Sequence, residues 1–366
     1  INSSQSKEKM SSEIKESVKE YYGKILQTNE DLKTNACVQE GKVRKEVREA
    51  LALCHDEVLS RYYGCGLVFP TAVEGVNVLD FGSGAGRDCF ILSKLVGQNG
   101  FVTGVDMTEE QVKVATKYIP YHTEKFGYSK PNVDFKLGYI EDLKEAGIKD
   151  ESCDLIVSNC VINLSPDKSS VFKEAFRVLK DGGELYFSDI YADRELPANI
   201  KEHKELWGEC LAGALYWKSF VDLSKEIGFS GPYLVTSRNM ACGNEELQKV
   251  LGDSKFVSAT YRLFKVGTKP DEKSCSVKYK GSVTESPETF QFDDKYTFDT
   301  NFQAVSCDIA NVLKNSRYSQ HFEFKDAEST CTTPSAPANS TDPFELANVV
   351  VTEKPPSCCK KAKACC

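Results

Sequence analysis

The sequence predicts an α/β protein built on a Rossmann-like, mainly parallel sheet covered by helices, and three observations support this. Short apolar runs alternate with amphipathic helical stretches from residue 76 onward, which is typical of parallel strands joined by helices. A glycine-rich turn, Gly82 to Gly86, lies between the first apolar run and a helical stretch. Asp106 ends the next apolar run, about 20 residues further on, where nucleotide-binding folds place an acid that contacts a ribose.

The first part of the chain is expected to be helical before the sheet begins. Ile14, Val18 and Tyr21 or Tyr22 share one face of a helix over 11–22, and 43–58 is expected to form one or two further helices. The later strands are predicted at 101–105, 133–137, 153–158 and 184–189, and the helices between them at 87–96, 109–126 and 168–179.

The pattern changes after residue 189. The segment 200–227 is mainly helical, and strand-like runs at 233–235 and 256–266 flank a helix at 244–251, so we expect a small mixed α/β domain built onto the sheet. Beyond residue 269, short strand-like runs predict a strand-rich C-terminal domain, at 276–279, 289–292, 296–298 and 321–324. The stretch 327–342 is rich in Ser, Thr, Pro and Ala and is expected to be loose. The predicted domains are therefore 1–190, 191–268 and 269–366.

Composition restricts the classes of function. A net charge of −8 over 366 residues, without a basic stripe, argues against a nucleic-acid surface. No apolar run approaches the length of a membrane span, and residues 1–20 are polar and unlike a signal peptide, so a cytoplasmic protein is expected. Fifteen cysteines in such a protein are expected to stay reduced, as ligands of soft metals or as redox groups.

The glycine-rich turn favours S-adenosylmethionine over a dinucleotide. Its spacing is Gly-x-Gly-x-Gly, and Arg87 stands where the dinucleotide fingerprint needs its last glycine. A glycine turn without a phosphate cradle, combined with Asp106 as the ribose acid, suits a methyltransferase. Ile140 and Glu141 follow another strand, where an acid and an apolar side chain could hold an adenine. An ordinary tight turn in a Rossmann-like domain that binds another ligand remains the alternative.

Four cysteines are candidates for chemistry. Cys160 follows the fourth strand at the carboxyl edge of the sheet, and Cys210 stands among small residues in the expected helix. Cys65 lies between two glycines in a loop expected to be exposed, and Cys37 lies in a polar linker. A single cysteine among apolar residues is usually inert packing, so the residues alone favour only Cys65 as a reactive thiol.

These motifs together resemble the arsenite S-adenosylmethionine methyltransferases. The matching segments are Tyr63–Gly66, Asp80–Asp88, Gly104–Thr108, Ser158–Leu164 and Gly208–Ala214, and the resemblance covers roughly residues 30 to 265. It implies transfer of a methyl group from S-adenosylmethionine to thiol-bound trivalent arsenic. The implied products are mono-, di- and possibly trimethylated arsenicals, which would serve arsenic detoxification.

The resemblance also implies roles for particular residues. It makes Cys37, Cys65, Cys160 and Cys210 catalytic, with Cys65, Cys160 and Cys210 holding the arsenic. It further implies that Cys37 joins Cys65 in a disulfide during turnover, which glutathione or thioredoxin then reduces. We expect the protein to be a monomer. The predicted cofactor-binding residues are Asp80, Gly82, Gly84, Gly86, Asp106, Met107, Ile140, Glu141 and Asn159.

Two rival functions remain open from the sequence. A methyltransferase for a small organic acceptor, such as a quinone or sterol precursor, would share the cofactor site and leave the cysteines incidental. A cysteine-rich metal-binding or storage protein would depend on the tail, with its pairs Cys358–Cys359 and Cys365–Cys366. Adjacent cysteines chelate zinc less well than Cys-x₂₋₄-Cys pairs, which disfavours this second rival. As a methyltransferase tail, the same segment is expected to capture arsenite or relay disulfides.

Overall fold

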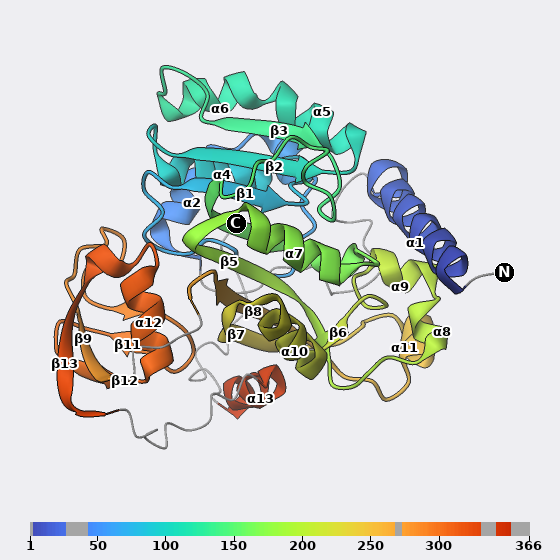
Figure 1. Ribbon diagram of the computed structural model, residues 1–366. Coiled ribbons are helices and arrows are strands. Elements are labelled where there is room, and N and C mark those ends of the chain that lie inside the picture. Colours follow the sequence, from blue (N-terminus) through green and yellow to red (C-terminus); the bar gives the residue numbers. More distant parts are fainter. Residues whose placement is uncertain (1–2, 27–42, 268–272, 331–341, 353–366) are drawn as a thin grey trace, which may run out of the picture.

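A computed structural model describes residues 3–26, 43–267, 273–330 and 342–352 (Figure 1). Its main sheet has the strand order β3-β2-β1-β4-β5-β8-β7, with the short β6 paired to β5. The first five strands are parallel to one another, as the sequence predicts. Their bounds are β1 Asn77–Phe81, β2 Phe101–Asp106, β3 Val133–Leu137, β4 Cys153–Asn159 and β5 Leu179–Ala192.

The parallel register brings the predicted cofactor residues to one edge of the sheet. Phe81 pairs with Val105 of β2 and with Ser158 of β4, so β1, β2 and β4 end side by side. The chain leaves β1 toward β2 on one side, while β4 and β5 lie on the other side of β1. Ligands of open α/β sheets bind at such a reversal of strand order, outside the carboxyl ends of the strands.

Helices cover both faces of this sheet, and each face has its own apolar cluster. One cluster packs residues of α2, α4, α5 and α6 against the sheet, and the other packs α7 and α10 against the opposite face. The bounds are α2 Lys45–Leu51, α3 Asp56–Leu59, α4 Arg87–Val96, α5 Glu109–Lys117, α6 Ile119–Phe126, η3 Ile162–Leu164, α7 Lys168–Val178 and α10 Trp217–Ile227. The helix predicted at 109–126 is two helices, because Pro120 starts α6.

The predicted N-terminal helix is confirmed and is longer than expected. It comprises α1 Ser3–Glu20 and continues directly into a short π-helix, η1 Tyr21–Ile25. Figure 1 shows α1 beside α9, at the side of the molecule where the carboxyl ends of the parallel strands lie. This position gives the N-terminal segment a part in the site described below.

The range 191–268 shares the main sheet. Its strands β7 Ser230–Met240 and β8 Phe256–Phe264 extend the sheet beyond β5 in antiparallel pairing, and the predicted boundary at residue 190 falls inside β5. Every residue of β8 is buried, as in an interior strand. The remaining elements of this range are α8 Ala198–Lys201, α9 Lys204–Gly208, β6 Leu215–Tyr216 and α11 Glu245–Leu251.

The C-terminal region is rich in short strands, as predicted, but it also contains helices that were not predicted. Its elements are β9 Lys273–Tyr279, β10 Phe290–Gln291, β11 Thr297–Phe298, β12 Gln303–Val305, α12 Cys307–Asn315, η4 Ser319–His321, β13 Phe322–Thr330 and α13 Pro343–Thr352. Ser306 caps α12 by accepting a hydrogen bond from the Ile309 amide, a signal present in the sequence. Part of the stretch expected to be loose, 327–330, belongs to β13, and 331–341 lies outside the described residues.

A buried ion network joins the C-terminal region to the sheet. The Glu184 carboxylate of β5 is fully buried and accepts hydrogen bonds from Arg262, Arg317 and Tyr318 at 2.8 to 2.9 Å. Burial alone would raise the pKa of Glu184, yet the two guanidinium groups lower it below its usual value. Arg317 also donates to the carbonyl oxygens of Thr71 and Ala72. The network therefore joins four segments that are distant in sequence.

Candidate active site

A cavity lies at the carboxyl edge of the sheet, where ligands of open α/β sheets bind. Eight of the nine predicted cofactor-binding residues line it: Asp80, Gly82, Gly84, Asp106, Met107, Ile140, Glu141 and Asn159. The structure thus gathers residues from the ends of β1, β2, β3 and β4 around one cavity.

Gly86 is the ninth residue, and it has a different role. A Cβ at Gly86 would lie 2.7 Å from the Phe135 ring and 3.0 Å from Phe90, so this glycine makes room for aromatic packing beneath the turn. Gly84 has no such neighbours, and its backbone faces open space, as a cofactor-binding turn requires. It has a positive φ of 52°, and a Cβ placed there would meet no heavy atom within 4 Å. The backbone at Gly84 is therefore open to a ligand.

Replacing Gly84 with valine is expected to abolish cofactor binding, because the branched side chain would fill the space where the ligand approaches the backbone. Calorimetric titration with S-adenosylhomocysteine measures this directly. The matched control is Gly127→Val, since Gly127 also has a left-handed backbone and open space around its Cβ position but lies outside the cavity. Equal loss of binding in both variants would mean that backbone strain, and not the blocked approach, is responsible.

Asp106 is held in a fixed orientation at the end of β2. Its two carboxylate oxygens accept hydrogen bonds from the Gly84 amide at 2.9 Å and from the Thr108 amide at 2.8 Å. Burial raises the pKa of Asp106, and these two backbone N–H groups partly oppose the rise. An acid fixed in this way is ready to accept further hydrogen bonds from the hydroxyls of a ribose.

Among the buried polar atoms of the cavity wall, the Ser83 hydroxyl oxygen and the Gln111 amide oxygen Oε1 have no hydrogen-bond partner within the described residues. A buried polar atom without a partner is costly, so a ligand that bears hydrogen-bond donors would be favoured here. Together with the open glycine and the fixed acid, these atoms fit the adenosine part of S-adenosylmethionine. When bound, that cofactor supplies an electrophilic methyl group.

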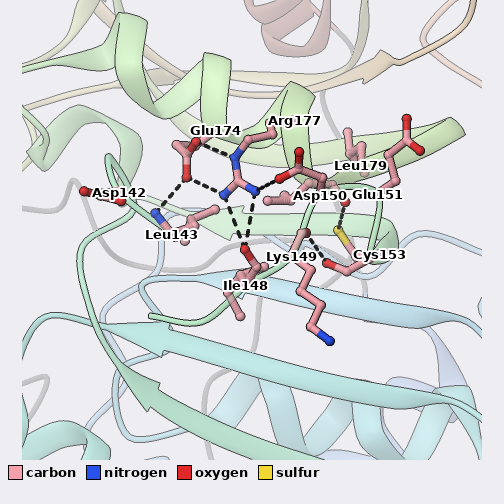
Figure 2. A network of polar contacts seen from close by, with 12 residues as sticks. Asp142, Leu143, Ile148, Lys149, Asp150, Glu151, Cys153, Glu174, Arg177 and Leu179 are labelled. Atoms are coloured by element: carbon pink, nitrogen blue, oxygen red, sulfur yellow. Dashed lines mark hydrogen bonds and ion pairs between the residues drawn. The ribbon is translucent and has the colours of Figure 1, made fainter. Parts of the chain in front are cut away.

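Ile140 and Glu141 form another wall of the cavity. Ile140 is buried, and Glu141 accepts hydrogen bonds from the Ser165 hydroxyl at 2.7 Å and pairs with Lys15 of α1 at 3.1 Å. The segment that follows these two residues in the sequence is held by a network of polar contacts with α7 (Figure 2). Arg177 of α7 donates to both carboxylate oxygens of Glu174 and pairs with Asp150, while Glu174 accepts from the Leu143 amide. This network fixes the segment 143–150 that follows the wall.

Asn159 lines the cavity, but its amide is occupied by the loop that carries Cys65. Its oxygen accepts from the backbone amides of Cys65 and Gly66 at 3.0 and 3.1 Å. Its nitrogen donates to the Gly66 carbonyl and to Asp88, and also to the hydroxyl of Tyr62. Asn159 therefore positions the thiol loop, and the structure supplies a role that the sequence prediction did not include.

Three of the four candidate cysteines are gathered in one apolar cluster next to the cavity. Cys65 and Cys160 are joined by a disulfide with their Cα atoms 5.7 Å apart, and the Cys210 thiol donates to the Cys160 carbonyl oxygen at 3.1 Å. Of the three, Cys160 also lines the cavity wall. Cys160 thus connects the sulfur cluster with the cofactor cavity.

One expectation about these cysteines differs from the structure. Cys65 was expected in an exposed loop but is only 1 % exposed, because its loop is held down by Asn159 and by Arg238 and Ser258, which donate to the Cys65 carbonyl. In the structure Cys65 is paired with Cys160. The disulfide between Cys37 and Cys65 that the resemblance implied during turnover stays a prediction, because Cys37 lies outside the described residues.

Cys160 and Cys210 both have left-handed backbone conformations, with φ of 59° and 61°. Such angles are unfavourable for residues other than glycine and persist where the surroundings enforce them. Cys210 follows α9 and is not part of a helix. Its amide donates to the Trp207 carbonyl at 3.0 Å, and the Leu211 amide donates to Leu206 at 2.8 Å. This is the Schellman motif, in which the left-handed position is usually glycine.

A buried acid and a lysine support the same region. Asp189 accepts from the Asn163 amide at 3.0 Å, and the Asn163 side chain donates to the Cys210 carbonyl at 3.4 Å. Lys168 donates to the carbonyls of Asn163 and Ser165. Burial raises the pKa of Asp189 to about 7 and lowers the pKa of Lys168 to about 8, while the attraction between the two groups opposes both shifts.

Several cavity residues were missed by reasoning from the sequence. Lys15, Val18 and Tyr22 reach the cavity from the N-terminal segment, and Gln111 reaches it from α5. Tyr62 lies under the Arg87 guanidinium, whose carbon is 3.4 Å from the ring centroid. No local pattern shows where a distant helix docks, whereas the position of Tyr62 next to the Tyr63–Gly66 segment was an available signal.

Comparisons with known proteins agree with this site. A family model described as a methyltransferase domain matches residues 72–250, and one described as the arsenite methyltransferase C-terminal domain matches 272–366. An arsenite methyltransferase of Rattus norvegicus is 50 % identical over 96 % of this chain and 98 % of its own length, and that of Homo sapiens is 49 % identical with the same coverage.

A solved structure shows the same relationship. The arsenic(III) S-adenosylmethionine methyltransferase CrArsM of Chlamydomonas reinhardtii superimposes with a TM-score of 0.75 and 41 % identity, over 79 % of this chain and 98 % of that one. Within the described residues, no helix is long and apolar enough to cross a membrane. On the strength of near-complete coverage at about half identity, this chain belongs to the arsenite methyltransferase family.

Proposed function

We propose that this enzyme transfers the methyl group of S-adenosylmethionine to trivalent arsenic held by the thiolates of Cys65, Cys160 and Cys210. The observation that carries the proposal is the position of Cys160. It contacts both other cysteines and also lines the cavity that fits the cofactor. An arsenic atom bound to Cys160 would therefore lie next to the transferable methyl group.

The chemistry of the three sulfur atoms suits this substrate. Soft thiolates select soft centres, and trivalent arsenic binds three of them as a pyramid that leaves its lone pair free. The lone pair would attack the methyl carbon while the methyl–sulfur bond breaks and S-adenosylhomocysteine leaves, so no proton has to be removed and no general base is needed. The enzyme then contributes the orientation of the pyramid and the exclusion of water. All three cysteines are at most 2 % exposed, which agrees with a site shielded from water.

A reductant is needed before arsenic can bind to the form seen in the structure. The disulfide between Cys65 and Cys160 occupies two of the three sulfur ligands. Opening it takes two electrons, which two glutathione thiols or one thioredoxin dithiol supply while forming a disulfide of their own. Methyl transfer formally oxidises the arsenic, and two enzyme thiols return it to the trivalent state as they form a disulfide. By resemblance to the family, these thiols include Cys37.

We infer a reducing compartment, the cytoplasm, and a monomeric enzyme. Four of the described cysteines, Cys54, Cys89, Cys153 and Cys242, are free thiols, which is usual for proteins kept reduced by glutathione and thioredoxin. Arsenite and methylated trivalent arsenicals are the proposed substrates. The range 191–268 is proposed to supply Cys210, and 269–366 to form a separate domain anchored through the Glu184 network.

The direct test is an assay with labelled S-adenosylmethionine, arsenite and a thiol reductant. We expect labelled mono- and dimethylated arsenicals, detected by chromatography coupled to mass spectrometry. Alkylation of the reduced enzyme with iodoacetamide before the assay should stop product formation. If labelled arsenicals are absent while a quinone or sterol precursor is methylated by the alkylated enzyme, the function is that of the rival organic-acceptor methyltransferase.

Truncation after Pro356 is expected to leave methylation working. The residues removed include Cys358–Cys359 and Cys365–Cys366, whereas the described residues of the cavity and of the cysteine cluster all come before residue 257 in the sequence. Initial rates measured with saturating glutathione should stay within about twofold of the full chain. A folded truncated enzyme without activity would show that the tail takes part in catalysis.

A further inference from the structure

The N-terminal segment contacts two walls of the active site. Lys15, Val18 and Tyr22 line the cofactor cavity, while Tyr21 and Tyr22 reach the turn that ends in Cys210. Figure 1 shows the same relationship at the level of elements, with α1 lying beside α9. This segment is therefore placed to connect the cofactor site with the arsenic site.

The contact with the Cys210 turn is centred on Glu209. Glu209 is fully buried, and a carboxyl group removed from water needs hydrogen-bond partners. The Tyr21 hydroxyl donates to Glu209 Oε1 at 2.5 Å, and the Tyr22 hydroxyl donates to the Gly208 carbonyl at 2.8 Å. The Tyr21 ring lies flat against Gly208, since a Cβ placed there would be 2.7 Å from the ring. Both residues before Cys210 are thus fixed from the N-terminal segment.

The contact with the cofactor cavity is made through Gln111. This side chain is 2 % exposed and lines the cavity, and its nitrogen donates to the Tyr22 carbonyl oxygen at 3.0 Å. A ligand that orders Gln111 also orders Tyr22, and Tyr22 is bonded to the turn before Cys210. Two hydrogen bonds, joined through Tyr22, therefore link the cavity wall to the turn that precedes Cys210.

We propose that Tyr21 is a positioning residue for the Cys210 thiol, and that the Gln111–Tyr22 contact makes cofactor and arsenic(III) bind cooperatively. The inference rests on the proposed function, because it takes Cys210 as an arsenic ligand. Cys210 has a left-handed backbone, which is unfavourable for a residue with a Cβ atom. The turn keeps this conformation only while neighbouring groups hold it. Tyr21 acts through Glu209 and does not itself touch the substrate. Coupling between two sites is reciprocal, so arsenic also tightens cofactor binding by the same factor.

Equilibrium dialysis of the reduced enzyme against arsenite, with and without S-adenosylhomocysteine, tests the proposal. For the wild type we expect arsenite to bind about tenfold more tightly when S-adenosylhomocysteine is present. In Tyr22→Phe, which loses the hydrogen bond to the Gly208 carbonyl, this enhancement should disappear. In Tyr21→Phe the arsenite affinity should fall about tenfold, because a hydrogen bond to a buried carboxyl group is lost. The affinity of Tyr21→Phe for S-adenosylhomocysteine alone should stay within about twofold of the wild-type value. Steady-state kinetics should show a raised KM for arsenite with an unchanged KM for S-adenosylmethionine.

Two further variants make the result specific. In Gly208→Ala the added Cβ atom would press against the Tyr21 ring. This variant should show the same loss of arsenite affinity as Tyr21→Phe. Tyr128→Phe removes a partly buried hydroxyl that donates to the Ser93 and Lys94 carbonyls, away from the cavity, and should bind like the wild type. Wild-type cooperativity retained in Tyr22→Phe, or wild-type arsenite affinity retained in Tyr21→Phe, would overturn the inference alone. Failure of the reduced wild type to bind arsenite at all would instead overturn the proposed function.

Discussion

Cys210→Gly is expected to abolish arsenical methylation while keeping the fold at least as stable as Cys210→Ala. Cys210 occupies the left-handed position of a Schellman motif, where glycine is the usual residue. A left-handed backbone costs a residue with a Cβ roughly 1–2 kcal/mol, and glycine avoids that cost. The cysteine therefore stands at a position where it is unfavourable for folding, which is expected of a residue retained for its sulfur.

The comparison with alanine isolates the backbone effect. Both variants lose the buried sulfur, so the burial of that atom cancels between them. Glycine loses more chain entropy on folding, by roughly 0.5–1 kcal/mol, and the relief of the left-handed angle outweighs this. Thermal unfolding under reducing conditions should give Cys210→Gly the higher midpoint, and neither variant should form methylated arsenicals. A lower midpoint for glycine would show that the left-handed backbone is not a source of strain.

The main sheet could be predicted from the sequence because buried parallel strands and amphipathic helices leave different periods in the chain. The cofactor wall followed from the same pattern, since the ends of parallel strands meet at one edge. The strands of the small mixed domain predicted at 191–268 extend the main sheet, because β8 pairs with β5 and β7 with β8, and local periodicity does not specify a strand's partner. Gly86 belongs to the same motif as Gly84, but its role depends on the distant Phe135 ring.

The arrangement of the three cysteines could be predicted from the sequence only in part. The resemblance brought Cys65, Cys160 and Cys210 together, and the structure places all three in one cluster. The resemblance did not predict the disulfide between Cys65 and Cys160. Which two of the three cysteines pair depends on the distances between the three loops that carry them. The left-handed backbone at Cys210 was not predicted, because the segment 200–227 was expected to be mainly helical and Cys210 was placed in that helix. The N-terminal wall of the cavity was equally hidden, since an amphipathic pattern shows which face is buried and not against which partner.

Serine substitutions at Cys160 and Cys65 are expected to have different effects on the two successive substrates. Inorganic trivalent arsenic has three positions to fill with thiolates, whereas trivalent monomethylarsenic has only two. Cys160 and Cys210 are assigned to those two positions, because Cys160 lines the cavity and the Cys210 thiol contacts its backbone. Serine offers a hard, protonated oxygen that is a poor ligand for arsenic. Cys160→Ser should therefore lose at least about a hundredfold in rate on both substrates.

Cys65→Ser should lose activity on arsenite but retain part of its activity on trivalent monomethylarsenic, because the assigned pair stays intact. This variant also lacks the disulfide that engages Cys160, so its remaining activity should depend less on the reductant. Cys37→Ser should behave likewise toward the two substrates. Product speciation with excess reductant distinguishes these outcomes. Cys153→Ser, at the other end of β4 and outside the cavity, controls for the loss of a buried thiol. If Cys160→Ser methylated monomethylarsenic and Cys65→Ser did not, Cys65 and not Cys160 would be the partner of Cys210.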